Sequence, residues 1–115
     1  MGAELVIKKE TLDEAEKKKF DEGWQKNAYN QYVSDLIPLN RSLADIRQEG
    51  CKADPIDVAR LPTASVVMCF HNEAFSVLLR GVHSIVERSP APLLKEVILV
   101  DDFSDMGRLN KRPKG

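Results

Sequence analysis

Two short apolar runs in the last third of the chain enclose a segment with helical periodicity. The runs occupy residues 64–70 and 97–100, and the segment 74–88 between them repeats apolar side chains at the spacing of one helix face. Pro90 and Pro92 follow that segment and end the helix, because proline cannot continue it. Both runs are apolar nearly throughout, which is typical of parallel strands buried on both faces. The pattern therefore predicts an α/β fold class with one βαβ unit.

The first part of the chain is mostly charged and predicts a surface helix. Thr11 followed by Glu14 has the spacing of a capping box, in which the Thr11 hydroxyl accepts from a backbone N–H and Glu14 reaches back. A stripe of four residues then recurs every fourth position, which predicts a single helical face. We interpret this face as one that docks on the rest of the fold; a helix that binds a partner protein is the alternative. The stripe consists of Phe20, Trp24, Ala28 and Tyr32.

Turn-forming residues and charge divide the chain into four segments. We expect a charged helical segment at 1–35 and an irregular connection at 36–62, where three prolines and Gly50 leave no room for a long helix. The βαβ unit occupies 63–105. The last segment, 106–115, contains basic but no acidic residues and is expected to be a disordered tail.

Composition excludes some classes of protein without indicating a function. A length of 115 residues allows one domain at most. The 17 basic and 18 acidic residues nearly cancel, so we expect no nucleic-acid partner held by bulk electrostatics. No apolar run approaches the roughly eighteen residues of a membrane-spanning helix, and the first residues do not read as a secretory signal. Cys51 and Cys69 form neither a disulfide scaffold nor a C-x-x-C site.

Polar side chains follow both predicted strands at the point where each strand ends. His71, Asn72 and Glu73 follow the first strand, and Asp101 and Asp102 follow the second. Ligands bind outside the carboxyl ends of the strands in an open parallel sheet, so these residues form the candidate site. A carboxylate there can accept from a ribose hydroxyl or a uracil N–H. Because the glycine-rich phosphate-binding motifs are absent, a nucleotide diphosphate would need another partner, such as a metal ion.

Each candidate residue also has a structural interpretation. Asn72 or Asp101 can cap a turn or a helix. Glu73 can be an acidic residue in the first turn of a helix, and His71 can be a structural histidine. A metal site built from His71 and the two aspartates has no diagnostic spacing, so we predict none. Cys69 is expected to be a small core residue rather than a nucleophile.

Several motifs in a fixed order resemble one enzyme family. They are Asp21-Glu22-Gly23-Trp24, Asn30-Gln31-Tyr32-Val33-Ser34-Asp35, Leu39-Asn40-Arg41-Ser42-Leu43, Val66-Val67-Met68-Cys69-Phe70-His71-Asn72-Glu73-Ala74, Leu78-Leu79-Arg80, Val82-His83-Ser84, Arg88-Ser89-Pro90 and Lys95-Glu96-Val97-Ile98-Leu99-Val100-Asp101-Asp102-Phe103-Ser104-Asp105. On these motifs the chain resembles the first part of the catalytic domain of the polypeptide N-acetylgalactosaminyltransferases. The resemblance extends from about residue 17 to residue 105.

The resemblance implies a fold and a reaction. The fold would be a partial GT-A (Rossmann-like) fold with one βαβ unit, preceded by a helical and coil segment. The family moves GalNAc from UDP-GalNAc to Ser or Thr of protein acceptors in mucin-type O-glycosylation, with retention of configuration and with Mn²⁺. Its members are Golgi membrane proteins.

The resemblance also implies roles for single residues. Asp102 would accept a hydrogen bond from the uridine of the donor, and residues 69–73 would line the uridine pocket, with Cys69 acting through its backbone. Cys51 looks like a cysteine that the family pairs with one far downstream. The nucleotide-sugar-binding residues implied in this way are Cys69, Phe70, His71, Asn72, Glu73 and Asp102.

After Asp105 the sequence no longer follows the family pattern. The Asp-x-His metal motif of the family lies further downstream, so we expect a truncated chain without the Mn²⁺ ligands, without a membrane anchor and without transfer activity of its own. One helix would also leave apolar faces of the sheet uncovered. A non-catalytic product that binds UDP weakly or associates with full-length relatives is the alternative. A complete flavodoxin-like module is disfavoured because only one βαβ unit is present.

Overall fold

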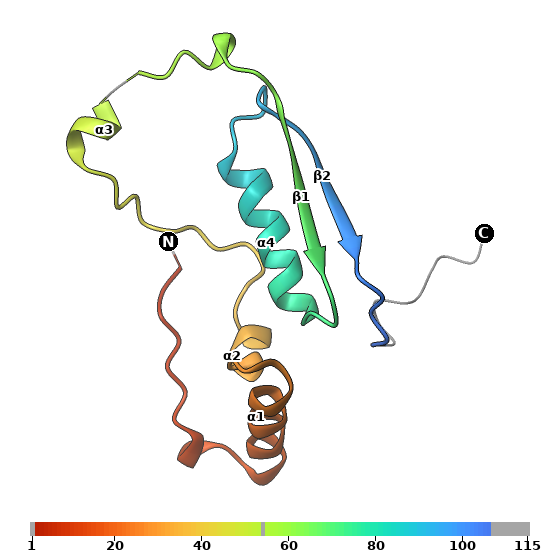
Figure 1. Ribbon diagram of the computed structural model, residues 1–115. Coiled ribbons are helices and arrows are strands. Elements are labelled where there is room, and N and C mark those ends of the chain that lie inside the picture. Colours follow the sequence, from red (N-terminus) through yellow and green to blue (C-terminus); the bar gives the residue numbers. More distant parts are fainter. Residues whose placement is uncertain (1, 54, 107–115) are drawn as a thin grey trace.

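The structure, a computed structural model, describes residues 2–53 and 55–106 and contains one βαβ unit preceded by short helices (Figure 1). The predicted α/β fold class is confirmed. The tail predicted at 106–115 lies outside the described residues apart from Met106. None of the described helices combines the length and the apolar composition that a membrane crossing requires. In chain order the elements are η1 (Lys9–Thr11), α1 (Glu14–Asn27), α2 (Gln31–Leu36), α3 (Glu49–Ala53), η2 (Val58–Arg60), β1 (Ala64–Phe70), α4 (Phe75–Arg88) and β2 (Leu94–Asp101).

The two strands, β1 and β2, pair in parallel. The predicted bounds of the first strand are confirmed, and the second strand is longer than the predicted 97–100. The register places Met68 beside Leu99 and Phe70 beside Asp101, so both strands end at the same edge of the sheet. Figure 1 shows both arrowheads at the end of the sheet where α4 begins. The parallel topology therefore brings the polar residues after each strand into one region.

Helix α4 packs along one face of the sheet and confirms the helix predicted at 74–88. The best-buried apolar side chains of the described residues are Ala74, the residue before the helix, and Leu78 near its start. Gly81 lies where the helix approaches β1 closely, since a Cβ at this position would lie 3.0 Å from the Met68 methyl carbon. A glycine here allows the helix to approach the strand.

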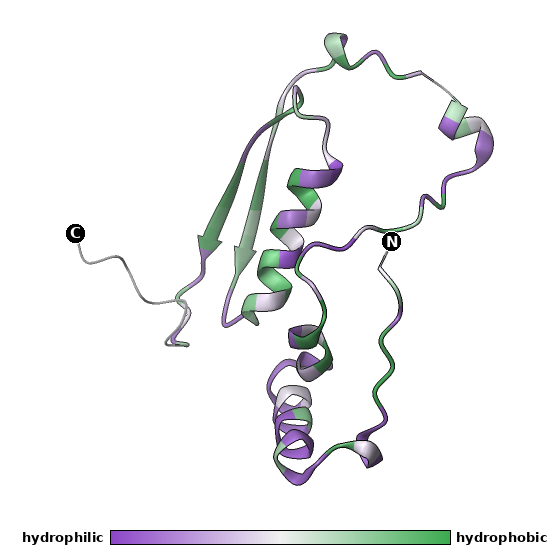
Figure 2. Ribbon diagram, turned by 180° about the vertical axis from the view of Figure 1, so that it is seen from behind, coloured by the Kyte–Doolittle hydropathy of each residue, from purple (hydrophilic) through white to green (hydrophobic). Residues whose placement is uncertain are grey.

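The opposite face of the sheet is open in the described part of the chain. Val67 and Ile98 are neighbours in the register, and they are 57% and 40% exposed. Cys69 is an exposed free thiol, so the prediction of a small core residue is wrong. The physical reason is that successive strand side chains point to opposite faces and α4 covers only one of them. In Figure 2 both strands are mostly green, the colour of hydrophobic residues, whereas α1 at the lower end of the molecule is largely purple.

Helix α1 is capped by Asp13 and not by Thr11. The Asp13 carboxylate accepts from the Glu16 N–H at 2.8 Å, and the Glu16 carboxylate accepts from the Asp13 N–H at 3.1 Å. The predicted box of Thr11 and Glu14 is wrong, because the preceding η1 turn uses the Thr11 hydroxyl, which donates to the Lys8 carbonyl at 2.8 Å. The helix therefore starts at Glu14, after a capping box that begins at Asp13 and not at Thr11.

Helices α1 and α2 form a hairpin, and the predicted single helical stripe is wrong. Ala28 ends α1 in the left-handed conformation with a φ of 58°, and Asn30 caps the start of α2. Because the chain reverses here, Phe20 and Tyr32 meet across the hairpin with ring centroids 6.3 Å apart. Trp24 remains 46% exposed. Phe20 and Tyr32 therefore contact each other across the hairpin, and the four residues do not form one docking face.

A chain of hydrogen bonds attaches this hairpin to α4. Ser76 donates to an Asp35 carboxylate oxygen at 2.6 Å, and the Ser34 and Ser76 hydroxyl oxygens lie 3.0 Å apart. Since the single Ser76 hydroxyl proton goes to Asp35, the Ser34 hydroxyl donates to Ser76 and accepts from Arg80 at 3.0 Å. Both serines are buried, and this network satisfies their hydroxyl groups.

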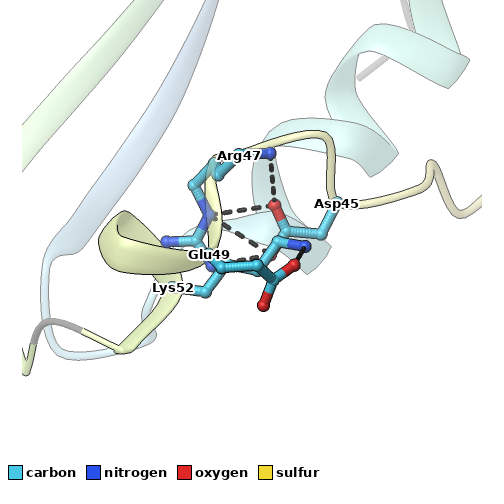
Figure 3. A network of polar contacts seen from close by, with 4 residues as sticks. All are labelled: Asp45, Arg47, Glu49 and Lys52. Carbon is cyan, nitrogen blue, oxygen red and sulfur yellow. Dashed lines mark hydrogen bonds and ion pairs between the residues drawn. The ribbon is translucent and has the colours of Figure 1, made fainter.

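The connecting segment, predicted to be irregular over 36–62, contains the short helices α3 and η2. Figure 3 shows the local polar network around α3, in which Arg47 pairs with Asp45 at 2.7 Å and Lys52 with Glu49 at 2.6 Å. Hydrogen bonds from Arg47 lower the pKa of Asp45 to about 2. These pairs join residues two or three positions apart, so they order the segment locally.

Candidate functional site

The carboxyl ends of β1 and β2 bring the two predicted polar clusters together. The Asp102 N–H donates to the Phe70 carbonyl at 2.8 Å, which continues the pairing beyond the end of β2. The His71 ring nitrogen Nδ1 lies 2.7 Å from the Asp102 carbonyl oxygen. The adjacency that the parallel arrangement predicts is therefore confirmed for these two residues.

The two neighbouring aspartates have different environments. The Asp101 carboxylate accepts from the Ser104 N–H at 2.9 Å and closes a turn. The hydrogen bond from the Ser104 side chain, and then the one from its N–H, lower the pKa of Asp101. Asp101 thus has the turn-capping role that the sequence left open. The exposed Asp102 carboxylate has no hydrogen-bond or ion-pair partner among residues 2–53 and 55–106. Asp102 is consequently the carboxylate that is free to accept from a ligand.

Asn72 fixes the loop that carries Asp102. Its backbone has a φ of 48°, a left-handed conformation that asparagine tolerates better than most residues. The Asn72 N–H donates to the Ser104 hydroxyl at 2.8 Å. The Asn72 carboxamide oxygen accepts from the N–H groups of Asp105 at 3.0 Å and Met106 at 3.3 Å. Asn72 therefore connects the residues after β1 to the residues after β2 through these hydrogen bonds.

These contacts also define the tautomer of His71. A carbonyl oxygen only accepts, so the Nδ1 atom beside the Asp102 carbonyl must carry a proton. The Asn72 amide nitrogen lies 3.1 Å from His71 Nε2, and it donates because the Asn72 oxygen already faces two backbone donors. In neutral His71 both ring nitrogens are thus satisfied by the site itself. The ring is held in one orientation beside Asp102.

Glu73 is joined to the N-terminal hairpin. Its Oε1 atom accepts from the Tyr29 hydroxyl at 2.8 Å and from the Ala74 N–H at 2.9 Å. Partial burial of the phenol, and then its hydrogen bond to the Glu73 carboxylate, raise the pKa of Tyr29 to about 12. Glu73 therefore bonds to the first turn of α4, as its position indicates, and in addition connects this turn to the N-terminal hairpin through Tyr29.

The remaining predicted residues lie around these strand ends or away from them. Phe70 is half-buried on the sheet face that α4 covers, and Cys69 is exposed on the opposite face. Cys51 lies in α3 as an exposed free thiol, and its disulfide with a downstream cysteine stays a prediction. The nucleotide-binding roles of these residues also stay predictions.

The described residues do not fit the Mn²⁺ ion that the family resemblance implies. Among residues 2–53 and 55–106, no group of three or more His, Cys, Asp and Glu side chains is placed to hold a metal ion. His71 and Asp101 already use their polar atoms on neighbouring backbone groups. No step of a reaction is therefore assigned to a metal at this site.

Comparison with known proteins relates the chain to one family. The family model described as Glycosyl transferase family 2 matches residues 65–109. Polypeptide N-acetylgalactosaminyltransferase 5 of Caenorhabditis elegans is 50% identical over 113 residues, which are 98% of this chain and 18% of that protein. The predicted family resemblance is confirmed.

Mammalian relatives agree with this assignment. Polypeptide N-acetylgalactosaminyltransferase 5 of Mus musculus is 46% identical over 103 residues, which are 90% of this chain and 10% of that protein. Polypeptide N-acetylgalactosaminyltransferase 10 of Homo sapiens is 50% identical over 91 residues, 79% of this chain and 15% of that protein. The chain thus spans less than a fifth of the length of these glycosyltransferases.

Sequence reasoning missed two residues at the strand ends. Ser104 is buried and contacts both Asn72 and Asp101. The signal for it was local, since Asp101 and Ser104 are both of residue types that turns favour. Tyr29 lies 44 positions before Glu73, and no local pattern predicts that contact.

Proposed function

We propose that this chain is part of a polypeptide N-acetylgalactosaminyltransferase and that its strand ends bind the uridine of a UDP-GalNAc donor. The observation that carries the proposal is the difference between the two aspartates: Asp101 closes a turn, and the Asp102 carboxylate has no partner among residues 2–53 and 55–106. A free acceptor outside the end of a parallel strand suits a uracil N–H or a ribose hydroxyl. The match to glycosyltransferases over residues 65–109 includes this position.

The neighbouring residues support Asp102 in this role. His71 holds the Asp102 carbonyl, and Asn72 holds the loop that follows it, so the carboxylate projects from a backbone fixed on two sides. Fixing an acceptor before the ligand arrives reduces the entropy lost on binding. Cys69 and Phe70 contribute the end of β1 on which this loop rests.

The proposal extends to the reaction that the relatives' names describe. The whole protein would transfer GalNAc from UDP-GalNAc to Ser or Thr of protein acceptors, with Mn²⁺ and in the Golgi. The chain of 115 residues is expected to bind UDP weakly and to transfer no sugar by itself. Measurable transfer to a Ser/Thr peptide by the purified chain would contradict that second expectation.

A titration of the purified chain with UDP tests the proposed site. Asp102→Asn and Asp101→Asn make the same chemical change one position apart, so they form a matched pair. Loss of the carboxylate acceptor in Asp102→Asn should weaken UDP binding about tenfold, as for a hydrogen bond to a charged group. Asp101→Asn should have the smaller effect, because it leaves the Asp102 carboxylate in place. Equal affinity of Asp102→Asn and the wild type would contradict the proposal.

CDP serves as a ligand control in the same titration. Uracil offers an N–H donor where cytosine has an acceptor, so a carboxylate that reads the base should favour UDP over CDP. Equal affinity for both nucleotides, together with a loss in Asp102→Asn, would assign Asp102 to the ribose instead. Calorimetry of both ligands against both variants gives this comparison directly.

Association with a full-length relative is the second candidate function. The exposed apolar face around Val67 and Ile98 favours it, because exposed apolar patches mark interaction surfaces. Sedimentation of this chain mixed with the human relative would show a complex if this function holds. Separate sedimentation of the two proteins would contradict it.

A further inference from the structure

Tyr29 connects the N-terminal hairpin to the candidate site. Its hydroxyl donates to Glu73 Oε1 at 2.8 Å, although the two residues lie 44 positions apart. The turn that carries Tyr29 is fixed at both ends, since the Ala28 N–H donates to the Trp24 carbonyl at 2.9 Å and Asn30 caps α2. The half-buried Tyr29 ring is therefore presented to Glu73 by ordered backbone.

Both donors to Glu73 meet the same carboxylate oxygen. The Ala74 N–H donates to Oε1 at 2.9 Å beside the Tyr29 hydroxyl. Two donors on one oxygen fix the rotation of a carboxylate, and its second oxygen then points away from both donors. Glu73 Oε2 has no partner in the part of the chain that the structure describes. The contact with Tyr29 thus determines the direction in which Glu73 presents its remaining acceptor.

Contacts other than the one made by Tyr29 also attach the hairpin to α4. The separate network of Ser34, Asp35, Ser76 and Arg80 attaches α2 to α4 through buried hydroxyl groups and a guanidinium group. Removing the Tyr29 hydroxyl should therefore leave the hairpin docked. The effect of that hydroxyl falls on the orientation of Glu73.

We propose that Tyr29 is a positioning residue that fixes the Glu73 carboxylate so that its Oε2 atom faces a nucleotide sugar bound at the ends of β1 and β2. The inference rests on the proposed function, because it takes that ligand as the group that Glu73 meets. Tyr29 acts through Glu73 and has no contact of its own with the ligand. The N-terminal hairpin then contributes to donor binding in addition to leading into the βαβ unit.

Tyr29→Phe and Tyr32→Phe provide a matched test in the full 115-residue chain. Each variant removes one phenol hydroxyl that donates to a glutamate, Glu73 in one case and Glu16 in the other. Tyr29→Phe should weaken UDP binding about three- to tenfold, the range of one hydrogen bond. Tyr32→Phe should leave the affinity unchanged. In a Glu73→Gln background, Tyr29→Phe should cause little further loss.

An NMR signal separates positioning from structural damage. The Ala74 amide donates to the oxygen that Tyr29 holds, so its chemical shift should move in Tyr29→Phe and not in Tyr32→Phe. The Ser34 and Ser76 signals should stay in place if the hairpin remains docked.

The outcomes distinguish this inference from the proposed function. UDP binding that is equal in both variants, with an unchanged Ala74 amide, overturns the positioning role. A simultaneous shift of the Ser34 and Ser76 signals also overturns it, because the effect would then be a general loss of docking. If the wild type binds no UDP, the proposed function fails. The Ala74 signal then still decides whether Tyr29 fixes Glu73.

Discussion

Arg80 of α4 donates to both the hydroxyl and the carbonyl oxygen of Ser34, at 3.0 and 2.7 Å, across 46 positions in the sequence. Its guanidinium group also donates to the carbonyls of Ile37 at 3.3 Å and Pro38 at 3.2 Å. Ser34 lies in the last turn of α2, where helix geometry leaves carbonyl groups without partners inside the helix, and Ile37 and Pro38 follow directly after that turn. One side chain of the βαβ unit thus completes the end of the hairpin helix.

Arg80→Ala should destabilise the chain by about 2 kcal/mol, because hydrogen bonds from a charged group contribute about that much and Ser34 is buried. The free energy of unfolding from urea titrations measures this loss. Arg47→Ala is the control, since Arg47 pairs with Asp45 at the surface and should change the free energy much less. Arg80→Lys should give an intermediate loss, because lysine lacks the planar fork that reaches several oxygens. Equal losses in Arg80→Ala and Arg47→Ala would contradict the network.

Asn72→Gly should loosen the loop that carries Asp102 while it keeps the left-handed backbone of this position. The N–H groups of Asp105 and Met106 lose their shared acceptor, so their hydrogen exchange should become faster. Asn72→Ala should have the same effect and a further cost of about 1–2 kcal/mol from its φ of 48°. Asn40→Gly, at an exposed position, is the control. Unchanged hydrogen exchange at both amides in Asn72→Gly would contradict the role of the Asn72 side chain as their acceptor.

The Asp101 turn should persist in mildly acidic solution. Its hydrogen bond from Ser104 lowers the pKa of Asp101 below the ordinary value of 3.8. A lowered pKa in the folded state gives stability that is present above the ordinary value and is lost as the pH falls through the folded value. The Ser104 amide signal should therefore stay in its hydrogen-bonded position at the ordinary value and move only at lower pH. Asp101→Asn should abolish this titration, and movement of the signal above the ordinary value would refute the prediction.

The contact between Tyr29 and Glu73 should weaken in strongly alkaline solution. Burial, and then the hydrogen bond to Glu73, raise the pKa of Tyr29 from 10.0 to about 12, and the negative charge of Asp35 adds to the effect. A raised pKa in the folded state gives stability that is complete below the ordinary value and is lost as the pH rises through the folded value. Tyrosinate absorbance should thus show a group that ionises with a pKa of about 12 and that disappears in Tyr29→Phe. Desolvation and the hydrogen bond to Glu16 also raise the pKa of Tyr32, and the Tyr32 signal should remain in that variant. Glu73→Gln should return that group toward 10.0, and a Tyr29 that ionises at 10.0 in the wild type would disprove the contact.

The sequence by itself determined the βαβ unit and the resemblance to one family. Apolar runs and helical periodicity depend on residues close together in the chain, so the bounds of β1 and nearly those of α4 could be predicted. Parallel pairing then required that His71 and Asp102 lie at neighbouring strand ends. The helix caps were less predictable, because Thr11 and Asp13 both suit a capping position, and the η1 turn favoured Asp13.

Only the tertiary structure decided which polar side chains of the site have partners within residues 2–53 and 55–106. The alternation of side chains placed Cys69 on the uncovered face of the sheet, although its run reads as buried. Asp101 and Asp102 are the same residue type at adjacent positions, and the hydrogen bond from the Ser104 N–H shows that Asp101 closes the turn. The contact of Tyr29 with Glu73 joins residues 44 positions apart. Such contacts depend on how separate elements meet in space, and patterns within a single element carry no information about their partners.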